Sequence, residues 1–245
     1  LLKQLETENR AATSEEQDTL SRYVGWGGIP QAFESTNERW SAEYAELKDL
    51  LTPEEYDAAR SSTLNAHYTA PVIIQSMYGA VEKMGLEPKA ILEPAMGVGN
   101  FFGLLPEQMQ KASLYGVELD SITGRIAKQL YPDAHITVDG FERVNFADNR
   151  FDLAVGNVPF GNYQLADSRY NKEHFFIHDY FFAKTLDKVR PGGIVAFVTS
   201  KGTMDKANTA VREYLAQRAD LLGAVRLPNN AFSKNAGTEV TSDII

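Results

Sequence analysis

The 245-residue sequence contains no cysteine, which excludes disulfide bonds, thiolate metal ligands and a cysteine nucleophile. This composition fits a reducing compartment, and we expect a cytoplasmic protein. No run of about 18 apolar residues occurs, so no membrane-spanning helix is expected. No signal peptide is visible either. Because the chain opens on Leu1 and stops inside a predicted strand that begins near Val240, we expect a fragment of a longer protein.

Basic residues are scarce in the first part of the chain. Residues 1–149 hold 12 Lys/Arg and 23 Asp/Glu, a net charge of −11, whereas residues 150–245 hold 12 and 10, a net charge of +2. The total of −9 argues against a free-standing nucleic-acid-binding protein. If a nucleic acid approaches this chain, we expect it at the C-terminal half.

The usual phosphate-binding loops are also missing. A short apolar strand from Ala90 to Glu93 runs into a glycine turn and a helix start, Pro94-Ala95-Met96-Gly97-Val98-Gly99-Asn100-Phe101. Phe102 replaces the third glycine of the dinucleotide fingerprint, and no Gly-Lys-Ser/Thr follows. The two glycines still let the backbone approach a nucleotide-like ligand, and Glu93 can bind an amino group or order the loop.

Acidic residues follow the next two predicted strands. Strand 114–117 ends at Glu118 and Leu119, where a carboxylate can accept both hydroxyls of a ribose; a surface acid before a helix is the alternative. Strand 135–138 ends at Asp139-Gly140-Phe141. There the acid can bind an adenine amino group and the ring can lie against the base, or the residues form a plain Asp-Gly turn. Asp120 is expected to cap the following helix.

A buried strand from Phe151 to Gly156 leads into Asn157-Val158-Pro159-Phe160. An amide and a backbone carbonyl can together accept hydrogen bonds from one amino group, and an aromatic ring can stack on a planar base. Ligands of open α/β sheets bind at this edge. We therefore expect the tetrapeptide to hold an amino group for methylation.

The segment after the tetrapeptide is polar and carries Tyr163 and Arg169, which suit contact with a substrate. It leads into a predicted helix from Glu173 to Val189, whose aromatic residues are expected to pack in the core. His174 and His178 lie four residues apart, but no third ligand is evident, so no metal site is predicted.

Residues 1–63 are expected to form an acidic helical segment, with helix starts at Ser14-Glu15-Glu16 and Thr52-Pro53-Glu54-Glu55. Between them, residues 23–30 (Tyr-Val-Gly-Trp-Gly-Gly-Ile-Pro) form either a packed turn or a lid over a ligand. Tyr68 and Thr69 precede a helix that starts near Val72. They could contact a ligand at its N-terminus, although Thr69 by itself is typical of an N-cap.

The remaining pattern continues the alternation of strands and helices, with a strand at 194–199, a helix at 209–218, a strand at 221–227 and a last strand from about 240. Pro191-Gly192-Gly193 is expected to form a sharp turn. The alternation predicts an α/β fold with a doubly wound, mostly parallel sheet.

These motifs in this order resemble the class I S-adenosylmethionine-dependent adenine-N6 DNA methyltransferases. The segments that carry the resemblance are 67–71 (His-Tyr-Thr-Ala-Pro), 93–101, Glu118, Asp139 with Phe141, 157–160 and 227–232 (Leu-Pro-Asn-Asn-Ala-Phe). The resemblance implies a Rossmann-like seven-stranded methyltransferase domain at 64–245, C-terminally truncated, behind the helical segment at 1–63. Residues 23–28 further resemble the front of large methyltransferase–helicase proteins of phages and conjugative elements, which would supply helicase or target-recognition domains.

The resemblance also implies the roles of the residues. The cofactor-binding set is Tyr68, Thr69, Glu93, Pro94, Ala95, Gly97, Gly99, Asn100, Phe101, Glu118, Leu119, Asp139, Gly140 and Phe141. A flipped adenine of duplex DNA would be held by Asn157, Val158, Pro159 and Phe160, without a strong general base and without a metal. The family's first proline is Val158 here, so the carbonyl is kept while the fixed φ is lost.

Three alternatives stay open. In the first, the methyl acceptor is an RNA adenine or a protein glutamine. In the second, the domain is a catalytically degenerate module that binds cofactor or DNA within a larger helicase-containing protein. In the third, the protein is a nicotinamide-dependent reductase. The last leaves the tetrapeptide without a role.

Overall fold

Seven strands form one sheet in a computed structural model that describes residues 1–63, 68–229, 231 and 241–245. The strand order is β3-β2-β1-β4-β5-β7-β6. The strands are β1 (Ala90–Glu93), β2 (Ser113–Glu118), β3 (His135–Val138), β4 (Phe151–Asn157), β5 (Val189–Ser200), β6 (Val225–Arg226) and β7 (Ser242–Ile244). β1 to β5 pair in parallel, and β7 is antiparallel to both β5 and β6. The order reverses between β1 and β4, which puts their loops beside each other at a topological switch point.

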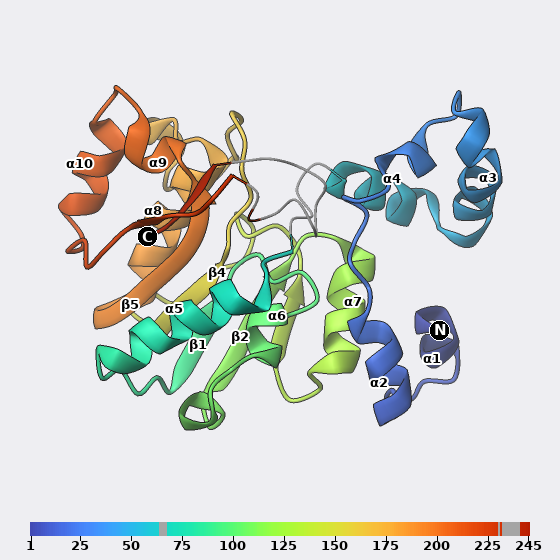
Figure 1. Ribbon diagram of the computed structural model, residues 1–245, viewed down its shortest axis with the longest axis horizontal. Coiled ribbons are helices and arrows are strands. Elements are labelled where there is room, and N and C mark those ends of the chain that lie inside the picture. The colour runs from blue at the N-terminus through green and yellow to red at the C-terminus, as the bar shows by residue number, and fades with distance from the viewer. Residues whose placement is uncertain (64–67, 230, 232–240) are drawn as a thin grey trace.

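Helices cover the sheet, and the N-terminal helices extend beyond it on the side of α7 (Ser121–Leu130) (Figure 1). Those of the α/β part are α5 (Pro71–Lys83), α6 (Asn100–Gly103), α7 (Ser121–Leu130), α8 (Ile177–Lys188), α9 (Gly202–Asp205) and α10 (Ala210–Ala216). The N-terminal segment contains α1 (Leu2–Thr7), α2 (Ser14–Ser21), α3 (Ser41–Leu50) and α4 (Pro53–Ser62). Single 3-10 turns occupy Pro30–Phe33, Glu38–Trp40, Glu107–Met109 and Asn171–Glu173.

Neighbouring residues of each central strand pack on opposite faces of the sheet. Ile91 belongs to a core cluster formed with α5, whereas Leu92 belongs to a second cluster formed with α8. Side chains alternate across a strand, so a sheet covered on both faces needs the near-continuous apolar strands found in this sequence. The predicted α/β class and mostly parallel sheet follow from this pattern.

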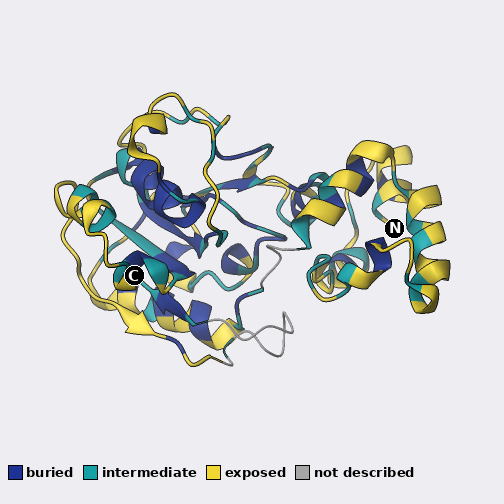
Figure 2. Cartoon of the chain, turned by 90° about the horizontal axis from the view of Figure 1, so that it is seen from above, coloured by how far each residue is buried: buried dark blue, intermediate teal, exposed yellow. Residues whose placement is uncertain are grey.

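The N-terminal segment forms a group of helices at one end of the molecule (Figure 2), next to α7 and with its own small core. The backbone amide of Ala12 donates to the side chain of Gln129 at 2.9 Å, and the Gln17 side chain donates to the Gln129 carbonyl at 2.8 Å. Thr52 and Glu55 form the capping box that starts α4, as the sequence predicts. For α2 the capping hydroxyl is that of Thr13 rather than Ser14.

Several predicted element bounds are wrong. The aromatic helix starts at Ile177 rather than Glu173, since His174 adopts a left-handed conformation with φ 53°. Pro191-Gly192-Gly193 does not separate two elements, because β5 passes through it with a register shift opposite Phe151 and Leu153. The strand expected at 221–227 shrinks to β6. Val240, the expected start of the last strand, lies outside the described residues.

Among the described residues, no helix is both long enough and apolar enough to cross a lipid bilayer.

Candidate active site

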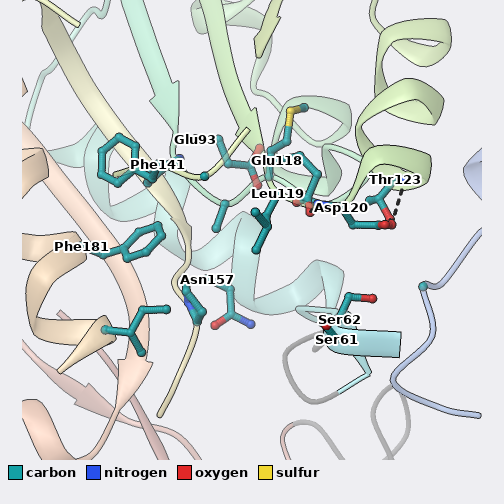
Figure 3. A pocket seen from close by; sticks show the side chains of 18 of the residues that line it. Ser61, Ser62, Glu93, Glu118, Leu119, Asp120, Thr123, Phe141, Asn157 and Phe181 are labelled. Atoms are coloured by element: carbon teal, nitrogen blue, oxygen red, sulfur yellow. Dashed lines mark hydrogen bonds between the residues drawn. The ribbon is translucent and has the colours of Figure 1, made fainter. Parts of the chain in front are cut away.

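A cavity of about 930 Å³ lies at the carboxyl edge of β1 to β4. Figure 3 shows its opposite walls, with Glu93, Glu118 and Leu119 on one side and Asn157 and Phe181 on another. Six carboxylates belong to its lining: Asp57, Glu93, Glu118, Asp120, Asp139 and Glu142. Among the described lining residues none is Lys, Arg or His. The charge of this lining disfavours phosphate groups and favours a cationic ligand.

The glycine turn after β1 adopts the conformation that its sequence predicts. Gly97 has φ 56° and Gly99 has φ 86°, both in the left-handed region that L-residues with a side chain rarely occupy. A Cβ on Gly99 would lie 2.5 Å from the Tyr131 ring, whose hydroxyl donates to the Gly99 carbonyl at 2.7 Å. Gly97 therefore presents bare backbone to the cavity, and Tyr131 braces the turn at Gly99. Pro94, Ala95, Asn100 and Phe101 also line the cavity, whereas Gly99, predicted to bind the cofactor, is not part of the lining.

Glu93 ends β1 and is 1% exposed. Its Oε2 has no hydrogen-bond partner, although it lines the cavity. Burial raises the pKa of this carboxyl well above its usual range, and the charge of Glu118 adds to the effect. An unsatisfied buried acid of this kind is costly unless a ligand donor completes it, so Glu93 fits a cationic amino group.

Glu118 ends β2 and connects two loops of the site. One carboxylate oxygen accepts from the Gly97 amide and the other from the Asp120 amide, each at 2.8 Å. Burial raises the pKa of Glu118 to about 7 in spite of these donors, and Asp120 contributes. Asp120 caps α7 through the Thr123 amide, as predicted. Leu119 projects into the cavity with 66% of its surface exposed, as a platform for a flat ligand.

Asp139, Gly140 and Phe141 line the cavity beyond β3. The Gly140 amide donates to Asp139 at 2.7 Å and Arg143 pairs with it, so the pKa of this carboxyl is lowered. Phe141 is 3% exposed and packs on Phe181 with ring centroids 5.1 Å apart. The structure thus brings all three residues to the cavity, with Phe141 facing it from the core.

Tyr68 and Thr69 lie at the glycine turn. A Cβ on Gly97 would touch the Tyr68 ring at 3.8 Å. The interpretation of Thr69 as an N-cap is wrong, because Ala70 precedes α5 and no side chain caps it. The hydroxyl of Thr69 is instead buried without a hydrogen-bond partner in the wall of the cavity. His67 lies outside the described residues.

The tetrapeptide begins within the sheet. Asn157 is the last residue of β4 and pairs with Val198 of β5, and the Val158 amide donates to the Val198 carbonyl at 3.0 Å. Proline at position 158 could not make this bond. The side chain of Val158 is 2% exposed, whereas Pro159 and Phe160 line the cavity. The hydrogen bond from Val158 to β5 therefore restrains the backbone at this position, where a proline would restrain it by fixing φ.

Of the two residues expected in the following loop, the structure brings one to the cavity. Tyr163 lines it, and its carbonyl accepts from the amide of Ile177 at 2.8 Å. Arg169 is not part of the lining and pairs with Asp148 and Asp187, both at 2.9 Å. Pairing with acids outside the loop, one before β4 and one on α8, thus directs Arg169 away from the position that we expected.

His174 and His178 do not converge on a metal-ligand set. Among the described residues there is no group of three or more His, Asp or Glu placed to hold a metal ion. His178 is buried beside Asp179, which pairs with Lys206.

Comparison with known proteins matches residues 54–245 to the N-6 DNA methylase family. The chain belongs to this family. Membership confirms the resemblance seen in the sequence, and the family implies S-adenosylmethionine as the cofactor.

Two curated proteins are also similar in sequence to this chain. "Defense against restriction protein B" of Escherichia phage P1 is 29% identical over 206 residues, which are 82% of this chain and 9% of that protein. Modification methylase CviBIII of Paramecium bursaria Chlorella virus NC1A is 25% identical over 167 residues, which are 66% of this chain and 43% of that protein. The chain therefore spans less than half the length of either relative.

Solved structures confirm the fold. A modification subunit of a putative type I restriction enzyme from Vibrio vulnificus YJ016 superposes with a TM-score of 0.59 at 19% identity, covering 95% of this chain and 49% of its own. A putative class I S-adenosylmethionine-dependent methyltransferase from Listeria monocytogenes also gives 0.59, at 17% identity, covering 92% of this chain and 79% of its own. The methylase sheet predicted from the sequence is the one observed.

Four residues of α4 line this cavity that the sequence did not predict there: Asp57, Ala58, Ser61 and Ser62. Gly25 also lines it, from the turn for which the sequence left open a packed turn or a lid. The available signal for the α4 residues was their spacing, because positions 57, 58, 61 and 62 share one helical face that carries only small or polar side chains.

Proposed function

We propose that this domain transfers the methyl group of S-adenosylmethionine to the exocyclic amino group of an adenine in DNA. The observation that carries the proposal is one cavity with two chemically distinct walls. The glycine turn and the acids after β1 to β3 form one wall, and Asn157, Pro159 and Phe160 form the other. We also propose the division into a helical segment at 1–63 and a methyltransferase domain at 64–245.

The first wall fits the cofactor in charge and shape. S-adenosylmethionine supplies an electrophilic methyl group on a cationic sulfur, beside an ammonium group and a ribose. Glu93 offers a buried acceptor for the ammonium, and Glu118 offers acceptors for ribose hydroxyls next to the bare backbone of Gly97. Asp139 and Phe141 complete the end for the cofactor's base. The six lining carboxylates and the lack of a basic residue in the described lining disfavour a dinucleotide with two phosphates.

The second wall fits a planar base with an amino group. The side-chain oxygen of Asn157 and the carbonyl of Val158 would accept the two N–H groups of that amine, and Phe160 would stack on the ring. The methyl-accepting nitrogen is then oriented by two acceptors, so positioning and local electrostatics supply the catalysis. An adenine reaches such a depth only when it is flipped from the duplex.

The size of the relatives supports a larger context. The matched region is 9% of the phage P1 relative. We therefore propose that this domain acts within a long polypeptide whose further regions, a helicase or a target-recognition part, bring DNA to it. The positive net charge of residues 150–245 suits approach of DNA from that half.

Two measurements test the proposed function. Calorimetric titration should detect S-adenosylmethionine binding, and a wild-type chain that binds none would overturn the assignment. Methyl transfer from tritiated cofactor should label adenine in duplex DNA, with RNA and protein as competing acceptors. The full-length protein is used because it supplies DNA affinity.

The decisive substitution is Asn157→Ala. We expect it to lower the rate of transfer at least 100-fold, since the amine loses an oriented acceptor, while cofactor affinity stays within about two-fold. Asn145→Ala, at an exposed position outside the cavity lining, is the matched control. Equal rates for Asn157→Ala and the wild type would refute the mechanism.

A further inference from the structure

One face of α4 closes the cavity from the N-terminal segment. Asp57, Ala58, Ser61 and Ser62 all line it, and their spacing of i, i+1, i+4 and i+5 places them on one side of the helix. Tyr56 and Ala59, on the other side of the helix, are buried, and so is Glu55 at the edge of the lining face. Figure 3 shows Ser61 and Ser62 across the cavity from Asn157 and below Asp120 and Thr123.

Ion pairs connect α4 to α7 and to α1. Arg125 of α7 pairs with Glu55 at 2.5 Å and with Glu6 at 2.6 Å, and Lys3 pairs with Glu55 at 2.9 Å. Burial by itself would raise the pKa of Glu55, but the Thr52 amide, Arg125 and Lys3 lower it to about 2. Glu55 thus caps α4 and also links it to α7, the helix that follows Glu118 and Asp120.

An aromatic chain joins the glycine-rich turn to the same helix. Ring centroids lie 5.9 Å apart between Tyr23 and Trp26, 5.4 Å between Trp26 and Phe33, and 5.3 Å between Phe33 and Tyr56. Gly25 lies inside this turn, has φ 69° and lines the cavity. The turn is packed, and it belongs to the cavity wall at the same time.

The chemistry of the α4 face indicates what it meets. Two hydroxyls and one carboxylate offer hydrogen-bond acceptors, and Ala58 leaves space for a close approach. Asp57 joins Glu118 and Asp120 in the same lining. Such a grouping repels a phosphate and attracts a ligand with hydroxyl or cationic groups. The cofactor meets this description, whereas the DNA backbone does not.

We propose that Asp57 and Ser61 of α4 hydrogen-bond the S-adenosylmethionine cofactor, so that the N-terminal segment supplies part of its binding site. The proposal rests on the proposed function and extends the donor site beyond the residues that the sequence motifs mark. Cofactor affinity then depends on a helix that precedes the first strand.

The test compares Asp57→Asn and Ser61→Ala with the wild type by calorimetric titration of S-adenosylmethionine. We expect about a ten-fold loss of affinity for Asp57→Asn and about a three-fold loss for Ser61→Ala. Glu54→Gln makes the same carboxylate-to-amide change one turn away, at an exposed position outside the lining, and should stay within about two-fold. Thermal unfolding verifies that each variant is folded.

A second titration, with 5′-methylthioadenosine, identifies the group contacted. This probe lacks both the amino-acid end and the sulfonium charge. An equal loss for both ligands therefore supports contact with the nucleoside, and a loss for the full cofactor alone supports contact with its cationic end. Unchanged cofactor affinity in both variants would overturn the proposal, as would a rise in KM for DNA alone. A wild type that binds no cofactor would fail earlier, at the proposed function.

Discussion

The two walls of the cavity select their ligands by different physics. The wall after β1 to β3 contains a backbone turn and five acids, whereas the wall after β4 offers an amide, a proline and aromatic rings; the acids are Glu93, Glu118, Asp120, Asp139 and Glu142. In a buried site, charge distinguishes a cationic ligand from an anionic one. Stacking and directed hydrogen bonds distinguish ligands by their shape. A donor that is cationic and an acceptor that is neutral and flat are thereby kept in their own halves. Substitutions in one wall should leave the other intact.

The largest effect is expected at Gly99, on the donor side. Gly99→Ala forces a side chain into a backbone with φ 86° and into the Tyr131 ring, 2.5 Å from the new Cβ. We expect cofactor affinity to fall at least 100-fold and the free energy of unfolding to fall by about 1–3 kcal/mol. Calorimetry and urea denaturation measure the two quantities.

The matched control is Gly28→Ala. A Cβ there would meet nothing within 4 Å, so both quantities should stay at the wild-type value. Retained affinity in Gly99→Ala would show that the turn does not approach the cofactor.

Phe160→Ala should affect the acceptor side alone. Loss of a stacking ring costs about 1–3 kcal/mol per base, so we expect KM for DNA to rise by roughly ten-fold or more. Cofactor affinity should remain unchanged, because Phe160 lies on the other wall. Steady-state kinetics with either substrate varied separates the two effects, and a parallel loss of cofactor affinity would contradict the division.

The donor wall should also respond to pH. Glu118 has a pKa of about 7, and a ribose needs its carboxylate form. Cofactor affinity should therefore rise about ten-fold between pH 6 and pH 8 and level off above that. Glu118→Gln should bind weakly at every pH, without this rise. An identical slope in the variant would assign the pH dependence to another group.

Stability of the empty protein should change with pH in the opposite direction. The folded pKa of Glu118 is raised above its ordinary value of 4.5, so the folded state holds more protons between about 4.5 and 7. Its contribution to stability is present below this window and is lost as pH rises through it. Urea denaturation of wild type and Glu118→Gln across the window checks the sign.

How far the sequence predicts this site depends on whether a residue's role is local. Gly97 forms a turn and Asp120 caps the helix that follows it, so both roles involve only neighbouring residues. The local sequence pattern is therefore sufficient to predict them. The pairing of Arg169 with Asp148 and Asp187, and the docking of α4 through Arg125, join residues distant in the sequence. No local pattern reports such pairs, which is why Arg169 was misplaced and Asp57 missed.

The smallest effect on catalysis is expected at position 158, where a backbone hydrogen bond and a proline are two ways of fixing the same carbonyl group. Val158→Pro restores the family's residue but removes the amide that donates to the Val198 carbonyl, leaving a buried acceptor unsatisfied. We expect a loss of about 1–3 kcal/mol in the free energy of unfolding. The transfer rate should change less than ten-fold, since the Val158 carbonyl persists. Val158→Ala keeps the amide and serves as the control for lost packing. A Val158→Pro variant that is as stable as the wild type and transfers methyl groups faster would show that the Val158–Val198 hydrogen bond positions the carbonyl less well than a proline does. The expected result shows that the hydrogen bond and the fixed φ position it equally well for catalysis.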